Sequence, residues 1–148
     1  MSLHQSILDQ LPYSHPFLFV DELTAVTENG ITGSYYFDPE LDFYRGHFTD
    51  EPITPGVILT ETMAQIGLVC LGIFLLRDEE LSTVLVAFSS ADVKFLTPVF
   101  PGETVTVTSK KIYFRFNKLT CEVELRKADG ELACKGILSG MFKTDDNA

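Results

Sequence analysis

A short stretch of the chain brings a histidine, a Pro-Gly pair and a glutamate close together in sequence. His47 lies among loop-forming residues, Pro55 and Gly56 follow, and Glu61 comes 14 residues after His47. A histidine ring titrates near neutral pH and can act as a general base. A carboxyl group whose pKa is raised by apolar neighbours can act as an acid. The pairing predicts proton-transfer chemistry that needs no metal and no organic cofactor.

An apolar helix is expected to position these groups. Thr54 is the predicted N-cap and Pro55 the first helical residue, because proline has no N–H to leave unpaired there. Gly56 would let a ligand approach the exposed amides of the first turn. The run 57–76 is apolar on every face except at Thr60, Thr62, Glu61 and Gln65. The last two are four residues apart and share one helical face, and a helix this apolar is normally enclosed by protein.

The length of this apolar run also raises the possibility of a membrane span, since about 20 apolar residues cross a bilayer. However, the uninterrupted apolar part covers only 66–76, and the mainly acidic segment 77–80 follows it. Glu61 and Gln65 would lie in hydrocarbon, at a considerable energetic cost. We therefore expect a core helix and no membrane span.

The flanking segments predict an antiparallel sheet. Strands are expected at 17–26, 31–37, 83–95, 103–116, 119–125 and 131–142, with hairpin turns at Asn29-Gly30, Asn117-Lys118 and Asp129-Gly130. A short helix is expected at 2–10 and a long irregular loop at 38–54, and long loops often carry function. The order α-β-β-α-β-β-β-β indicates one antiparallel sheet enclosing one helix, an α+β design.

Composition limits the number of domains and the kind of partner. A chain of 148 residues with 45% hydrophobic content is expected to form one domain over residues 1–148. The net charge of −10 divides into −12 over residues 1–93 and +2 over 94–148, so nucleic acid is a poor partner. The spacing of Cys70, Cys121 and Cys134 suits neither disulfides nor a metal. With no signal peptide visible at residues 1–10, we expect a reducing, cytoplasmic compartment.

Several motifs resemble those of a known family. Gly46-His47-Phe48, Pro55-Gly56-Val57, and Glu61 followed by Met63-Ala64-Gln65 are similar to the signature of the hot-dog-fold 3-hydroxyacyl-[acyl-carrier-protein] dehydratases, of the FabZ-like type whose carboxylate is Glu. Segments 11–21 and 93–102 and the strands up to residue 142 agree with that family in order along the chain. The resemblance covers nearly the whole sequence, and it implies the hot-dog fold, in which an antiparallel sheet wraps a long central helix.

The resemblance implies dehydration of (3R)-hydroxyacyl-carrier-protein thioesters to trans-2-enoyl thioesters, in fatty-acid or polyene-type lipid biosynthesis. His47 would remove the proton next to the carbonyl, and Glu61 would protonate the leaving hydroxyl. A mechanism in which His47 makes both transfers and Glu61 holds the hydroxyl or a water is equally compatible. The N–H of Gly56, at the positive end of the helix, would polarise the thioester carbonyl. The other residues expected at the substrate are Phe48, Pro55, Val57 and Gln65.

The resemblance also implies partners. Members of the family form a back-to-back dimer with a continuous sheet, in which His47 of one chain would meet Glu61 of the other. A dimer would also cover the long sheet edge that this design leaves open. An acidic acyl carrier protein would dock on a local patch of basic residues. The alternative is that these basic residues are ordinary solvated charges on the strands. The candidates for the patch are Lys94, Lys110, Lys111, Arg115 and Lys118.

The chain departs from the family pattern in places. Tyr13 and Ser14 stand where the family has a histidine and a basic residue, and we interpret His15 and His4 as structural or surface residues. Residues 96–97 are Leu and Thr where the family has basic residues, which favours a specialised carrier protein. Two alternatives to the dehydratase remain open. One is a hot-dog acyl thioesterase that uses a carboxylate-activated water, and the other is a non-catalytic subunit that completes a partner's site in a heterodimer.

Overall fold

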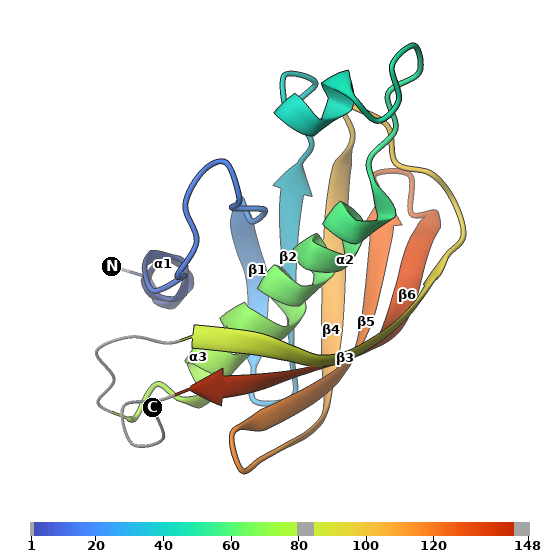
Figure 1. The fold of residues 1–148 in the computed structure, drawn as a ribbon. Coiled ribbons are helices and arrows are strands. Elements are labelled where there is room, and N and C mark those ends of the chain that lie inside the picture. The colour runs from blue at the N-terminus through green and yellow to red at the C-terminus, as the bar shows by residue number, and fades with distance from the viewer. Residues whose placement is uncertain (1, 80–84, 144–148) are drawn as a thin grey trace.

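A six-stranded antiparallel sheet curls around one long central helix (Figure 1). The computed structural model describes residues 2–79 and 85–143, so the first two residues of the strand predicted at 83–95 lie outside the described part. A short helix α1 (Leu3–Asp9) precedes the sheet, and a 3-10 turn (Asp42–Arg45) lies in the long loop. The strands are β1 (Glu22–Thr27), β2 (Gly30–Tyr36), β3 (Leu85–Phe95), β4 (Thr104–Arg115), β5 (Lys118–Lys127) and β6 (Leu132–Lys143).

The strand order β1-β2-β4-β5-β6-β3, with antiparallel pairing throughout, confirms the expected α+β hot-dog design. The hairpin signals in the sequence lie at the observed β1–β2, β4–β5 and β5–β6 turns. The pairing of β3 with β6, which are distant in sequence, was not indicated by any local pattern. It closes the sheet over the C-terminal part of the helix (Figure 1).

The central helix runs from Gly56 to Leu75 in three parts, which are α2 (Gly56–Ala64), a π-helical segment (Gln65–Cys70) and α3 (Leu71–Leu75). Every residue from 62 to 74 is buried, as a helix that is apolar on all sides requires. By length and composition this helix could cross a membrane, but 78% of its most apolar window is buried inside the fold. The sheet covers it closely, because a Cβ on Gly72 would overlap the ring of Phe142.

Alternating side chains on β4 form part of the sheet's contribution to the core. Val105, Val107 and Ser109 of β4 are buried, and their neighbours along the strand are exposed. Ser109 is polar, yet its hydroxyl donates a hydrogen bond of 2.9 Å to the carbonyl of Gly67, within the π-helical segment. That bond satisfies both groups in the apolar interior and joins the sheet to the centre of the helix.

The strand predicted at 17–26 is shorter than expected, since β1 begins only at Glu22. The preceding main chain hydrogen-bonds to a side chain. The N–H of Phe19 donates to Gln65 Oε1 at 2.7 Å, and the carbonyl of Phe17 accepts from Gln65 Nε2 at 3.0 Å. Because Gln65 takes these backbone groups, they are not available to a neighbouring strand.

Within residues 2–79 and 85–143, no strand pairs with the outer edge of β3, which is the last strand of the sheet. It also exposes large apolar side chains. Leu85, Phe88 and Phe95 are 54%, 48% and 53% exposed. An open edge with apolar side chains is the form expected of a strand that pairs with another chain.

Candidate active site

The loop between β2 and α2 holds His47 in a defined tautomer. His47 Nδ1 lies 2.8 Å from the carbonyl oxygen of Ile53, and the backbone N–H of Ile53 donates to the carbonyl of His47 at 2.9 Å. A carbonyl oxygen only accepts, so Nδ1 carries the proton, and in the neutral ring Nε2 has the free lone pair. The ring stacks on Phe48, with 4.0 Å between centroids. This arrangement leaves a nitrogen that can act as a base.

The start of the central helix differs from the prediction by one residue. Pro55 is the N-cap, and Gly56 is the first helical residue. Thr54 was expected to cap the helix, but its hydroxyl is hydrogen-bonded to the hydroxyl of Tyr44 and its N–H donates to the carbonyl of Val99 at 2.9 Å. These contacts hold the end of the loop in place, so Pro55 and not Thr54 occupies the N-cap position.

The first amides of the helix are available to a ligand. Among the hydrogen bonds of the described residues, none uses the N–H of Gly56 or Val57. Val57 is 76% exposed, and a Cβ on Gly56 would lie 3.1 Å from the ring of Phe95. The absence of a side chain at Gly56 therefore lets Phe95 pack beside an unpaired N–H at the positive end of the helix.

Glu61 lies one turn further along the helix, half-buried. Burial raises the pKa of its carboxyl group, and the hydrogen bond from Gln65 offsets part of that rise. Gln65 Nε2 donates to Glu61 Oε2 at 3.0 Å. Gln65 is completely buried and its orientation is fixed by the backbone of Phe17 and Phe19, so the carboxyl group is held in one position.

A cavity of about 200 Å³ adjoins Glu61. Its walls come from the segment after α1, from the central helix and from β3. The lining residues are Tyr13, Phe17, Glu61, Ala64, Leu68, Val69, Val86 and Phe88. Apart from Glu61, none of these was predicted from the sequence, because the contribution of each depends on elements that are distant along the chain.

The single chain does not bring the predicted base and acid together. No hydrogen bond or ring contact among the described residues joins His47 to Glu61, and His47 is absent from the cavity wall beside Glu61. Phe48, Gly56 and Val57 are also absent from that wall. The chain thus carries two half-sites, one around the loop and helix start and one around Glu61.

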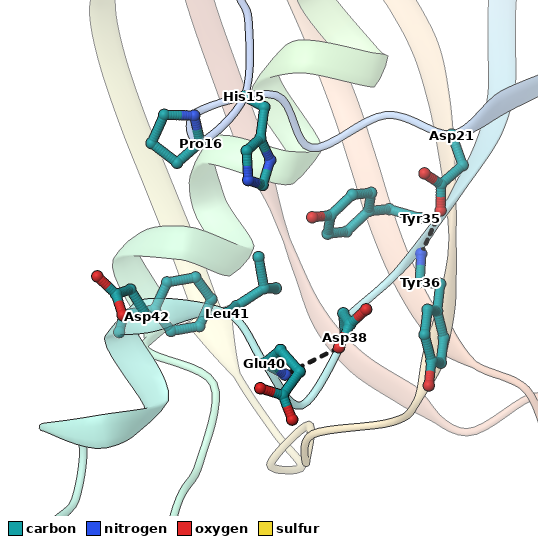
Figure 2. Close-up of a pocket in the computed structure, with 10 residues that line it drawn as sticks. His15, Pro16, Asp21, Tyr35, Tyr36, Asp38, Glu40, Leu41 and Asp42 are labelled. Atoms are coloured by element: carbon teal, nitrogen blue, oxygen red, sulfur yellow. Dashed lines mark hydrogen bonds between the residues drawn. The ribbon is translucent and has the colours of Figure 1, made fainter.

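A larger cavity, of about 650 Å³, lies elsewhere (Figure 2). None of the site residues predicted from the sequence lines it. His15 contributes to its wall, and most of the remaining wall is acidic or aromatic, including Asp21, Asp38 and Tyr35. Three of the acids have local partners, and Asp42 accepts from Arg45 at 3.0 Å. Asp21 accepts from the N–H of Tyr36 at 2.6 Å, and Asp38 accepts from the N–H of Glu40 at 2.8 Å.

The basic residues considered for carrier docking are spread over the sheet. Lys94 precedes Phe95, whose ring contacts Gly56, and it pairs with Lys135 across the β3–β6 ladder. Arg115 and Lys118 face each other across the β4–β5 turn. That turn is about 36 Å along β4 from Thr104, at a rise of about 3.3 Å per residue. Because Thr104 lies at the same end as the helix start, Arg115 and Lys118 lie at the far end of the sheet from the unpaired N–H groups.

Comparison with known proteins gives consistent matches over most of the chain. A family model described as a FabA-like domain matches residues 11–138. The FabZ 3-hydroxyacyl-[acyl-carrier-protein] dehydratase of Ehrlichia chaffeensis is 33% identical over 144 residues, covering 96% of each chain. The corresponding enzyme of Clostridium perfringens is 35% identical over 135 residues, covering 88% of this chain and 91% of that one.

Solved structures show the same fold at low identity. The dehydratase heterocomplex ApeI:P from Xenorhabdus doucetiae superposes with a TM-score of 0.79 at 13% identity, covering 99% of this chain and 95% of that chain. A mutant thioesterase from Pseudomonas aeruginosa superposes with a TM-score of 0.68 at 12% identity, covering 97% and 96%. Dehydratases and thioesterases thus share this architecture, and the fold by itself does not distinguish the two reactions.

Proposed function

The chain belongs to the FabA-like family, and from that premise we propose that it is a 3-hydroxyacyl-[acyl-carrier-protein] dehydratase of fatty-acid or polyene-type lipid biosynthesis. It removes water from (3R)-hydroxyacyl-carrier-protein thioesters and releases trans-2-enoyl thioesters. The observation that carries this function is the pair of half-sites, which offers a histidine with a free Nε2 and a carboxyl group whose burial raises its pKa.

The proposed reaction uses only groups of the protein. His47 Nε2 takes a proton from the carbon next to the thioester carbonyl. The N–H of Gly56 donates to the carbonyl oxygen and stabilises the negative charge that develops there. The carbon–oxygen bond to the 3-hydroxyl then breaks, its electron pair goes to the oxygen, and the proton of Glu61 completes the departing water. The raised pKa of Glu61 favours the protonated form that this step requires.

We infer that the working unit is a homodimer in which His47 of one chain faces Glu61 of the other. The separation of the two half-sites within a chain supports this arrangement. The open edge of β3, with its exposed apolar side chains, supports the accompanying continuous sheet. Phe48, Pro55 and Val57 would then contact the thioester, and Gln65 would orient Glu61.

The proposed partner is an acyl carrier protein, which is acidic and would approach the helix start beside Lys94. Leu96 and Thr97, which follow Phe95, give less charge attraction than the basic residues of the family would, which supports a specialised carrier. We also propose one dehydratase domain over residues 1–148 and a cytoplasmic location. The buried free thiols Cys70, Cys121 and Cys134 suit a reducing compartment.

The test is the ultraviolet absorbance of the enoyl thioester during incubation of the purified chain with a short 3-hydroxyacyl carrier-protein substrate. The signal is expected to grow with the wild type and to be lost with His47→Ala. Release of free thiol without an enoyl signal would identify a thioesterase instead. Binding of acyl groups without turnover, by a folded dimer, would identify a subunit that needs a different partner.

A further inference from the structure

Among the described residues that line the cavity beside Glu61, the hydroxyl of Tyr13 is the one polar side-chain group besides the carboxyl group. The six other lining residues are apolar: Phe17, Ala64, Leu68, Val69, Val86 and Phe88. An apolar wall suits an acyl chain, whereas Glu61 and Tyr13 are the described side chains in this wall that can pair with a polar atom of a ligand.

Tyr13 is held in the cavity by its surroundings. Its ring lies against that of Phe17, with 6.4 Å between centroids, and the backbone carbonyl of Phe17 is bound by Gln65. Burial and then the negative charge of Glu61 raise the pKa of Tyr13 to about 12. The phenol therefore stays protonated over the ordinary pH range and acts as a hydrogen-bond donor.

One oxygen of the Glu61 carboxyl group has no partner among the described residues and can bind the 3-hydroxyl of the substrate. Glu61 Oε2 accepts from Gln65 Nε2, and among the described residues no hydrogen bond is made by Oε1. One carboxyl oxygen is thus held by the protein and the other is available to substrate. A substrate hydroxyl bound at Oε1 would still have a lone pair to satisfy in a mainly apolar cavity.

We propose that Tyr13 is a substrate-contacting residue whose phenol donates a hydrogen bond to the 3-hydroxyl oxygen of the acyl thioester, beside Glu61. The inference rests on the proposed function. As the carbon–oxygen bond breaks, its electron pair moves to the oxygen and Glu61 supplies the proton that makes water. Tyr13 keeps its own proton and stabilises the oxygen as its negative charge grows.

The experiment compares Tyr13→Phe with Tyr36→Phe, the same change at a tyrosine outside this cavity. Affinities are measured in a His47→Ala background, which prevents turnover, for two carrier-protein thioesters, 3-hydroxybutyryl and butyryl. Tyr13→Phe is expected to weaken the hydroxy ligand about 5- to 10-fold and to leave the butyryl ligand unchanged. In the His47-containing enzyme it should lower kcat about 10-fold. Tyr36→Phe should change none of these values.

Equal weakening of both ligands would show that Tyr13 is only part of the apolar wall and would overturn the inference. Unchanged affinity for both would overturn it as well. Tyr13→His, which keeps a ring with an N–H donor, serves as a second variant and should retain the preference for the hydroxy ligand. Because the wild-type enoyl signal is recorded separately, a failure of the dehydratase function is distinguishable from a failure of the Tyr13 contact.

Discussion

The side-chain amide of Gln65, a completely buried residue, donates a hydrogen bond of 3.0 Å to Glu61 Oε2. The same amide donates to the carbonyl of Phe17 at 3.0 Å, and its oxygen accepts from the N–H of Phe19 at 2.7 Å. Gln65 therefore connects the proposed catalytic carboxyl group to the segment that follows α1. A single side chain therefore both orients Glu61 and holds the backbone of Phe17, which lines the cavity beside it.

Replacing Gln65 with methionine, which has a similar length, should lower both stability and activity. The change leaves the backbone groups of Phe17 and Phe19 without partners, at a cost of about 1–3 kcal/mol for each group that is truly buried. Urea unfolding should show this loss, and the dehydration rate should fall because Glu61 is no longer held. Gln5→Met, which removes an exposed hydrogen bond to Asp9, is the control and should change stability by less than about 0.5 kcal/mol. Equal losses of stability in Gln65→Met and Gln5→Met would contradict the role of Gln65.

Glu61→Gln should make the protein inactive and, at neutral and alkaline pH, more stable than the wild type. The folded state raises the pKa of Glu61, so it binds the proton more tightly than the unfolded state does. The stability that the protonated carboxyl group contributes is fully present below the pKa that Glu61 has in the unfolded chain. It is lost as the pH rises through the higher pKa that Glu61 has in the folded protein. The glutamine keeps an oxygen that can accept from Gln65 but cannot ionise.

Urea unfolding of both proteins from about pH 5 to pH 8 measures this difference. The advantage of Glu61→Gln over the wild type should increase as the pH rises. Glu22→Gln, at an exposed position on β1, is the matched control. A stability difference that does not change with pH would argue against a carboxyl group whose pKa is raised by folding.

Gly56→Pro should remove the proposed carbonyl donor without breaking the helix. Gly56 is the first helical residue, where proline is tolerated, and Pro55 already has the extended conformation (φ −59°, ψ 138°) required before a proline. Gly56→Ala adds the same Cβ near Phe95 but keeps the N–H, so it separates the donor from crowding. We expect a fall in kcat of about 100-fold for proline and of only a few-fold for alanine. Similar kinetics in the two variants would exclude the donor role.

Mixing two inactive variants should restore activity if the site is shared between chains. Dimers formed from His47→Ala and Glu61→Gln chains contain one site with an intact His47 and an intact Glu61. Random exchange of equimolar chains makes half of the dimers mixed, so about a quarter of the wild-type rate should return. Each variant alone, refolded in the same way, provides the baseline. A mixture that stays inactive after exchange is verified would place the complete site within one chain.

Local sequence patterns determined the main elements of this protein. The run after Gly56 is apolar on every face, so it could be stable only as an enclosed helix, and the four-residue spacing of Glu61 and Gln65 placed both on one side of it. Period-two alternation predicted β4 and β5 because the side chains of a strand alternate between its two faces. The motifs around His47 and Glu61 also pointed to the chemistry and the family.

Only the tertiary structure decided which distant residues meet. Thr54 has the right chemistry for an N-cap, but Tyr44 takes its hydroxyl, and the main chain of residues 17–19 bonds to Gln65 instead of to a strand. The placement of Tyr13 against Glu61, 48 residues later in the chain, has no local signature. Contacts between distant segments depend on how the whole sheet packs around the helix, and local periodicity contains no information about that packing.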